Sequence, residues 1–248
     1  FFSLLVLLLF APRMATAQQR VLDQLTEESL ATWIFEEGRV SGAFQLQHRR
    51  GVKPGRSPHV RIARAGERER ITGQPLTRPN GNIDVVLGDD AGVDARGASA
   101  RGFFRVDRPG MAIVLHLMAV LQDPGHRAGH DPFVRYELRD AQGRLLNCGS
   151  YKVESASSGP GWVFHPAGFT EKELKAMAKD KKHPDERAFV HYLPWTEFLV
   201  PLIGLEGQEV SLEVMVGDCQ KEGHWGLAAF DLEVVELGRR ATVPGDRT

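Results

Sequence analysis

Apolar residues occur at every second position in two segments near the C-terminal end of this chain. In the first segment, Ser211, Glu213 and Met215 alternate with the apolar residues Val210, Leu212, Val214 and Val216. In the second segment, Asp231 and Glu233 alternate with Ala228, Phe230, Leu232 and Val234. Successive side chains of a β-strand point to opposite faces of the sheet. This period of two therefore predicts two strands that each bury one face.

Further strand signals lie upstream of these two segments. Residues 111–121 are apolar at ten of eleven positions and lie between two Pro-Gly pairs, which predicts a strand buried on both faces. Residues 83–87 and 102–106 are shorter apolar runs. The turn at residues 140–143 joins residues 133–138 to the next segment as a hairpin. About eight strands at this spacing predict an all-β fold, an antiparallel β-sandwich.

Three segments depart from this strand pattern. Residues 20–35 carry a weak helical period. Residues 170–182 begin with Thr170 and have a glutamate three positions later, which predicts a short charged helical insertion on the surface. Residues 49–70 hold eight Lys/Arg against two Glu and predict a mobile surface loop. That basic loop is either simply solvated or binds a polyanion.

The N-terminal residues predict export. Residues 1–11 are apolar at ten of eleven positions, and Ala15-Thr16-Ala17 follows them. This combination is typical of a signal peptide over residues 1–17, whereas the alternative is a buried core helix. No second apolar run is long enough to span a membrane. We therefore expect a mature protein that is secreted or at the cell surface.

The charges of the chain almost cancel. Lys and Arg number 31 against 32 Asp and Glu, a net charge of −1. This balance argues against a protein that coats nucleic acid, so we expect no nucleic-acid partner. The sequence leaves the oligomeric state open.

Several motifs resemble those of a known class of module. They are the segment AVLQDPGHRAGHDPF at 119–133, the segment YELRDAQGRLLNCGSY at 136–151, and the segment 194–235 that ends with DCQKEGHWGLAAFD. The chain is similar to β-sandwich modules of large secreted proteins of gliding bacteria, where they stand beside PKD or immunoglobulin-like repeats. The resemblance implies a galactose-binding-like jelly roll and adhesion or carbohydrate binding. Leu227 and Ala229 replace two tyrosines of the motif, which puts an aromatic ligand platform in doubt.

With this resemblance the chain divides into four parts. They are the signal peptide over 1–17, an N-terminal segment with the first strand and the basic loop over 18–80, the jelly-roll core over 81–237, and a tail over 238–248.

Cys148 and Cys219 are the two cysteines of this chain. In an exported protein they predict a disulfide, which would close a loop of about seventy residues and stabilise the fold by ~4 kcal/mol. The alternative is two unpaired buried thiols.

The recognised loops are rich in histidine and aspartate. They carry Asp123, His126, His130, Asp131, Asp218 and His224. Such side chains bind transition metals or hydrogen-bond sugar hydroxyls. We predict a pocket between residues 122–131 and 218–226, where Asp123, His126, Asp218 and His224 contact the ligand. Trp225 would offer a stacking face. Alternatively, Asp123 and Asp218 cap turns, the histidines bond backbone carbonyls, and Trp225 is a packing residue.

A structural calcium ion is a further expectation. Phe35-Glu36-Glu37-Gly38 resembles the first strand of carbohydrate-binding jelly rolls, in which carboxylates of the first and last strands often share one Ca²⁺. Glu36 and Asp231 are the matching ligands here. The alternative is an ordinary solvent-facing acid on each strand.

No common nucleophile motif occurs in the sequence. There is no G-x-S-x-G and no P-loop. The sequence therefore predicts a non-catalytic binding or adhesion module whose partner is a glycan or another cell-surface polymer. The alternatives are a metal-dependent hydrolase that uses the loop His/Asp set, and a structural spacer domain of a surface assembly.

Overall fold

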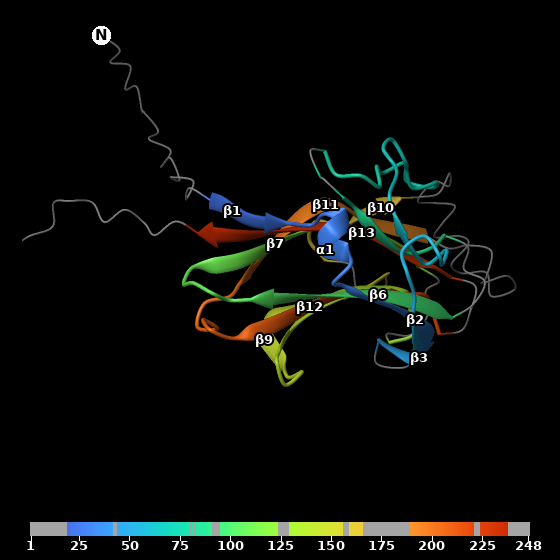
Figure 1. The fold of residues 1–248 in the computed structure, drawn as a ribbon. Coiled ribbons are helices and arrows are strands. Elements are labelled where there is room, and N and C mark those ends of the chain that lie inside the picture. Colours follow the sequence, from blue (N-terminus) through green and yellow to red (C-terminus); the bar gives the residue numbers. More distant parts are fainter. Residues whose placement is uncertain are drawn as a thin grey trace, which may run out of the picture.

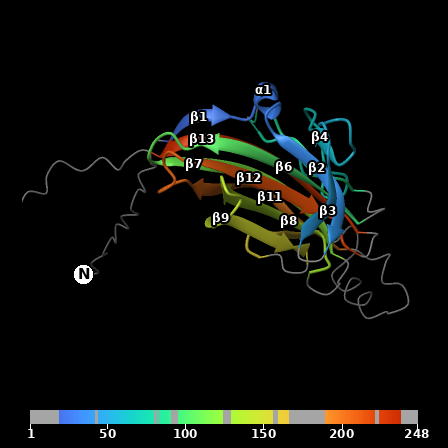
Figure 2. The same ribbon diagram turned by 60° about the horizontal axis from the view of Figure 1, so that its bottom comes forward.

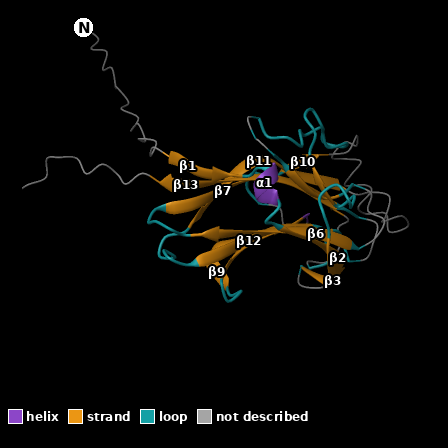
Figure 3. Ribbon diagram, viewed as in Figure 1, coloured by secondary structure: helices purple, strands orange, loops and turns teal. Residues whose placement is uncertain are grey.

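The structure is a computed structural model that describes residues 19–41, 44–79, 81, 83–90, 95–123, 129–155, 159–165, 189–220 and 224–237. Two antiparallel sheets lie face to face and form a β-sandwich (Figure 1). The described part contains one short helix, α1 (Glu27–Leu30), and is otherwise strands and loops (Figure 3). The predicted jelly-roll β-sandwich is confirmed.

The larger sheet has seven strands in the order β10–β11–β7–β13–β5–β4, and β1 also pairs with β13. Its strands are β1 (Gln19–Gln24), β4 (Val60–Ile62), β5 (Val85–Gly88), β7 (Met111–Asp123), β10 (Val163–His165), β11 (Phe189–Pro201) and β13 (Gly226–Leu237). The two long central strands, β7 and β13, are the apolar run and the second alternating segment of the sequence.

The smaller sheet has six strands in the order β3–β2–β6–β12–β8–β9. Its strands are β2 (Ile34–Ser41), β3 (Gln45–Gly51), β6 (Arg96–Arg105), β8 (Phe133–Asp140), β9 (Leu145–Glu154) and β12 (Glu209–Gly217). Figure 2 shows β2, β3 and β4 at one end of the sandwich and β1 at the other.

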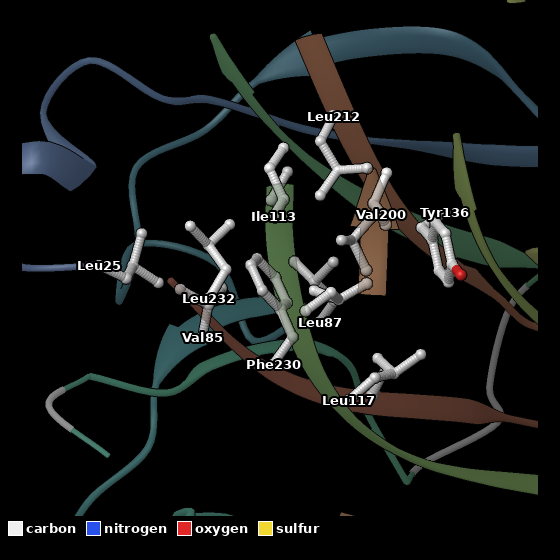
Figure 4. Close-up of a cluster of buried hydrophobic side chains, with 14 of the residues drawn as sticks. Leu25, Val85, Leu87, Ile113, Leu117, Tyr136, Val200, Leu212, Phe230 and Leu232 are labelled. Carbon is white, nitrogen blue, oxygen red and sulfur yellow. The ribbon is translucent and has the colours of Figure 1, made fainter. Parts of the chain in front are cut away.

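The core lies between the two sheets and follows from the alternation (Figure 4). Phe230 and Leu232 of β13 point into it, as does Leu212 of β12. On β7, Leu117 points into the same core, whereas its neighbour Met118 packs in a second apolar cluster. That second cluster also contains Leu76 and lies on the other face of the sheet, so β7 is buried on both faces as predicted.

The weak helical period over residues 20–35 does not correspond to one helix. These residues form β1, the short helix α1 and the start of β2. Thr26 caps α1, because its hydroxyl accepts a hydrogen bond from the Ser29 N–H at 3.1 Å. Pairing of β1 with β13 stabilises this segment more than a weak isolated helix would, because short helices are only marginally stable by themselves.

Residues 49–70 are not a single loop. They include the end of β3 and the whole of β4, so the prediction of one mobile loop is wrong. Several of the arginines bind carboxylates, including Arg61 to Glu67 at 2.6 Å. The N-terminal segment therefore contributes strands to both sheets and does not stand apart from the sandwich.

The helical insertion over residues 170–182, the signal peptide and the tail lie outside the described residues. Among the residues that are described, no helix has the length and apolar character needed to cross a bilayer.

Candidate ligand-binding site

The two recognised segments contact each other through backbone hydrogen bonds, from Gln220 to His130 and from Gln122 to Trp225, and Asp218 and His224 are buried. Asp218 is 4% exposed, and its Oδ1 accepts a hydrogen bond from the Gly226 N–H at 3.0 Å. Its Oδ2 accepts one from the Arg96 N–H at 3.4 Å. His224 is 3% exposed, with its Nδ1 3.2 Å from the Sγ of Cys219. These contacts join the ends of β12 and β13, as in the turn-capping alternative.

Trp225 is buried as well and offers no exposed stacking face. It packs in the apolar cluster with Met118 and Val120, and its backbone N–H donates to Gln122 Oε1 at 3.3 Å. Asp123 ends β7, with its Oδ2 3.7 Å from Nε2 of His191. His126 lies outside the described residues. Of the predicted ligand-binding residues, Asp218, His224 and Trp225 are thus buried within the protein.

The strand register contradicts the predicted disulfide. The side chain of Cys148 lies outside the described residues, but its backbone belongs to β9. Phe133 of β8 pairs with Glu154 of β9 on one side and with Gly217 of β12 on the other, so these three residues lie at the same level of the sheet. Cys219 follows Gly217 by two residues. Cys148 is displaced from Glu154 toward the opposite end of the sheet. Two strand spacings and several residues of rise put the two cysteine backbones on the order of 20 Å apart, and a disulfide needs Cα atoms ~4.4–6.8 Å apart.

The predicted calcium pair is also contradicted. Phe35 and Phe230 both point into the core, so the adjacent Glu36 and Asp231 lie on the opposite outer faces of the sandwich. One Ca²⁺ requires its oxygen ligands at ~2.3–2.6 Å, which these two carboxylates cannot both reach. In the described part of the chain, no group of three or more His, Cys, Asp or Glu side chains is arranged to hold a metal ion.

Asp231 instead belongs to an ion-pair cluster on the outer face of the larger sheet. Arg78 donates to Asp231 Oδ2 at 2.7 Å and to Glu233 Oε1 at 2.9 Å, and one of its Nη atoms lies 2.8 Å from Nε2 of His116. Asp84 accepts a hydrogen bond from the Arg78 backbone N–H at 3.1 Å. His116 is the one polar residue of the apolar run 111–121. Its contact with Arg78 in this cluster explains why a polar side chain occurs there.

Asp84→Asn is expected to stabilise the protein above neutral pH. Burial, and after it the nearby Asp231, raises the pKa of Asp84 to about 6. A folded-state pKa above the unfolded value of about 3.9 favours the fold at low pH, and this contribution is lost as pH rises through 6. The variant should gain about 2 kcal/mol in free energy of unfolding at pH 7.5 and nothing at pH 4.

Urea titrations of both proteins across this pH range measure the effect. Because burial and Arg78 lower the pKa of His116, the wild-type profile alone mixes opposing contributions. The difference between the two proteins isolates Asp84. A pH-independent difference would contradict the prediction.

Three open hollows lie elsewhere among the described residues, at the end of the sandwich where β2, β3 and β4 meet. The first has a volume of about 280 Å³ and is lined by Glu37, Gly38, Arg39, His48, Arg50, Ala95 and Arg96. The second, of about 350 Å³, shares Glu37, Arg50 and Arg96 and extends over residues 51–53 and 56–59. We call these two hollows the basic groove.

A third hollow, of about 950 Å³, continues the groove. It shares Arg56, Ser57 and Pro58 with the second hollow and extends over residues 61–62 and 64–67, adding Arg61 and Arg64. The three hollows therefore follow one another along the basic segment of the sequence.

A bulge between β2 and β3 shapes the floor of the groove. The register shifts between Glu37 and Arg39, and His48 on the facing strand has a left-handed φ of 51°. A Cβ at Gly38 would lie 2.5 Å from the carbonyl oxygen of Gln47, so only glycine permits this close approach. Side chains on both sides of this bulge, Arg39 of β2 and His48 of β3, line the first hollow.

Glu37 of β2 binds Ser57, which belongs to the segment 56–59 that lines the second hollow. It is 2% exposed, accepts a hydrogen bond from Arg50 Nε at 2.6 Å and also accepts one from the Ser57 hydroxyl. Burial raises the pKa of Glu37, but the bonds from Ser57 and Arg50 outweigh it and leave that pKa lowered. The carboxylate thus stays charged and holds residue 57 against β2.

Sequence reasoning missed Arg39, His48 and Arg96 as members of one site. They come from separate strands and carry no shared motif. The available signal was the excess of cations over residues 49–70, for which a polyanion-binding role was the alternative interpretation.

Comparison with known proteins gives structural neighbours only. No family model and no curated protein matches the chain. The module TmCBM61, solved in complex with β-1,4-galactotriose, aligns at 12% identity over 84% of this chain and 90% of the module, with a TM-score of 0.41. The mannan-recognising module TmCBM27 aligns at 13% identity over 89% and 99%, with a TM-score of 0.38.

An enzyme is also among the neighbours. The alginate lyase AlyC3, solved with dimannuronate, aligns at 11% identity over 86% of this chain and 92% of the lyase, with a TM-score of 0.34. At these identities and TM-scores the neighbours assign no function to this chain. The strand pairing itself shows that the chain is a jelly-roll β-sandwich.

Proposed function

We propose that this chain is a non-catalytic glycan-binding module and that the basic groove holds the ligand. The observation that carries the proposal is the run of three adjoining hollows, which share lining residues and stay open to solvent. Sites for small molecules are mostly enclosed and apolar. An open, elongated and polar depression suits a segment of a polymer better than a compact small molecule.

Two features favour binding over hydrolysis. Asp218 and His224 of the loop set are buried, and each contacts the protein itself. Glycosidases generally act with two carboxyl groups across the scissile bond. The carboxylates among the described residues that line the three hollows are Glu37 and Glu67, and arginines bind both, Arg50 at 2.6 Å from Glu37 and Arg61 at 2.6 Å from Glu67.

Export fits the same proposal. A signal peptide over residues 1–17 would place the module outside the cytoplasm, where matrix and cell-surface polysaccharides are present. The module would then act in adhesion or in holding a larger protein on such a polymer.

The double variant Lys53→Ala/Arg56→Ala is expected to lose at least about tenfold in affinity for the bound glycan, because hydrogen bonds to charged groups contribute ~1.5–3 kcal/mol each. Both side chains are exposed and line the groove, so the melting temperature should stay close to that of wild type. Binding to a polysaccharide panel, followed by calorimetry on the hits, measures both affinity and fold.

The matched control is Arg105→Ala/Arg108→Ala. It removes the same charge at the end of β6 away from Arg96 and the groove, and should leave affinity unchanged. A third variant, His224→Ala, tests the recognised loops. If His224→Ala abolishes binding in a folded protein while the groove variant binds as wild type, the groove is not the site. Absence of binding to every polysaccharide would favour the structural spacer.

A further inference from the structure

We propose that the glycan is anionic and that the groove recognises carboxylate or sulfate groups repeated along the polymer. This inference rests on the proposed function and specifies its ligand class. Five Lys/Arg side chains line the basic groove, Arg39, Arg50, Lys53, Arg56 and Arg96, with His48 and His59 beside them. Among the described residues that line the groove, Glu37 is the one carboxylate, and Asp89 lies 2.9 Å from His59. The overall net charge of the chain is −1.

Lys53 and Arg56 of the groove differ from arginines elsewhere, because no described carboxylate neutralises their charge. On the smaller sheet, Arg49 and Arg101 both bind Glu213, at 2.7 and 3.1 Å. Among the described residues, by contrast, no carboxylate lies within ion-pair distance of Lys53 or Arg56. Like charges held together repel, and an anion between them removes that repulsion. The positive charge of Lys53 and Arg56 therefore lies unneutralised in the second hollow.

The single carboxylate of the groove does not cancel this charge. Glu37 is buried beneath Arg50, which binds it, and the Arg50 side chain remains 71% exposed. Lys53 and Arg56 add two exposed positive charges beside it, and neither has a carboxylate within ion-pair distance among the described residues. Arginine suits this role, because its planar guanidinium donates two parallel hydrogen bonds to a carboxylate or a sulfate-like oxyanion.

The lining also argues against a neutral sugar. No Trp, Tyr or Phe is among the described residues that line the three hollows. Flat aromatic faces are the usual apolar contact for bound rings, and single-stranded nucleic acids also rely on them for stacking. Without such faces, charge and hydrogen bonds must supply the affinity.

The test measures affinity for four immobilised or soluble polymers: polygalacturonate, dextran sulfate, uncharged dextran and polyglutamate. We expect binding to polygalacturonate, to dextran sulfate or to both, at least tenfold weaker binding to uncharged dextran, and loss of most affinity between 0.05 and 0.5 M NaCl. The comparison of the two charged glycans distinguishes carboxylate from sulfate as the recognised group.

Glu37→Gln provides the sharpest variant. Glutamine keeps an oxygen that accepts the Ser57 hydroxyl but removes the one negative charge, so affinity for the charged glycan should rise severalfold. Lys53→Glu/Arg56→Glu should lower it at least a hundredfold, whereas Arg105→Glu/Arg108→Glu should leave it unchanged. A melting curve for each variant confirms that it is folded. If Glu37→Gln unfolds the protein, the charge-reversal pair still decides.

The outcomes separate this inference from the proposed function. Salt-independent binding to an uncharged glycan, lost in Lys53→Ala/Arg56→Ala, would keep the glycan-binding function and overturn the anionic ligand. Equal affinity for polyglutamate would overturn the glycan assignment, because the groove would then respond to charge alone. No binding to any polymer would overturn both.

Discussion

Phe230→Ala is expected to lower the free energy of unfolding by about 3–5 kcal/mol, the range for large-to-small changes in a packed core. Phe230 is completely buried, and its ring centroid lies 5.8 Å from that of Trp33. It lies among Leu87, Leu117 and Leu232 between the sheets (Figure 4). Alanine would leave a cavity that strands from both sheets cannot close without shifting their register.

Urea denaturation followed by tryptophan fluorescence measures this loss. Phe103→Ala is the matched control, because Phe103 is 48% exposed and has the same side chain. It should change stability by less than about 1 kcal/mol. Equal losses in the two variants would show that Phe230 is not a core residue.

Glu213→Ala is expected to cost about 3 kcal/mol. Glu213 is 3% exposed and accepts hydrogen bonds from Arg49 at 2.7 Å and Arg101 at 3.1 Å. Arg135, 8% exposed, lies 3.9 Å away. Removing one partner of a buried ion pair costs ~3–5 kcal/mol because the other charge is left uncompensated. We place the effect at the low end, since Arg49 and Arg101 retain partial contact with water.

The control is Glu209→Ala at the start of the same strand, where the side chain is exposed. It should change the free energy of unfolding by no more than about 0.5 kcal/mol. The double variant Glu213→Ala/Arg135→Ala should recover part of the loss if the buried guanidinium causes it. A loss at Glu213 no greater than that at Glu209 would contradict the proposed role.

The sequence predicted the strands best where burial is one-sided or complete. The alternation over residues 210–216 and 228–234 specified β12 and β13, because a side-chain period of two has one physical interpretation. The run over residues 111–121 specified β7 in the same way. The helical period over residues 20–35 was misleading, because residues 19–24 pair as β1 with β13, a strand about two hundred residues away in the sequence.

The burial and contacts of the individual side chains of the predicted site could not be predicted in this way. Asp218, His224 and Trp225 carry the residue types of a binding site, but type and loop position do not determine burial. Their use in joining β12 to β13 depends on how closely the two sheets pack. Glu36 and Asp231 failed as a pair for a related reason, since the face of each strand is known from sequence but not which sheet it joins.

The sequence by itself determined the all-β class, the principal strands and the excess of cations over residues 49–70, because each is a property of neighbouring residues. Only the tertiary structure decided that Arg39, Arg50 and Arg96, from three strands, line one groove with Lys53 and Arg56. It also decided that Cys148 and Cys219 lie too far apart to bond. Long-range strand order sets which distant residues meet, and no local pattern in the chain encodes that order.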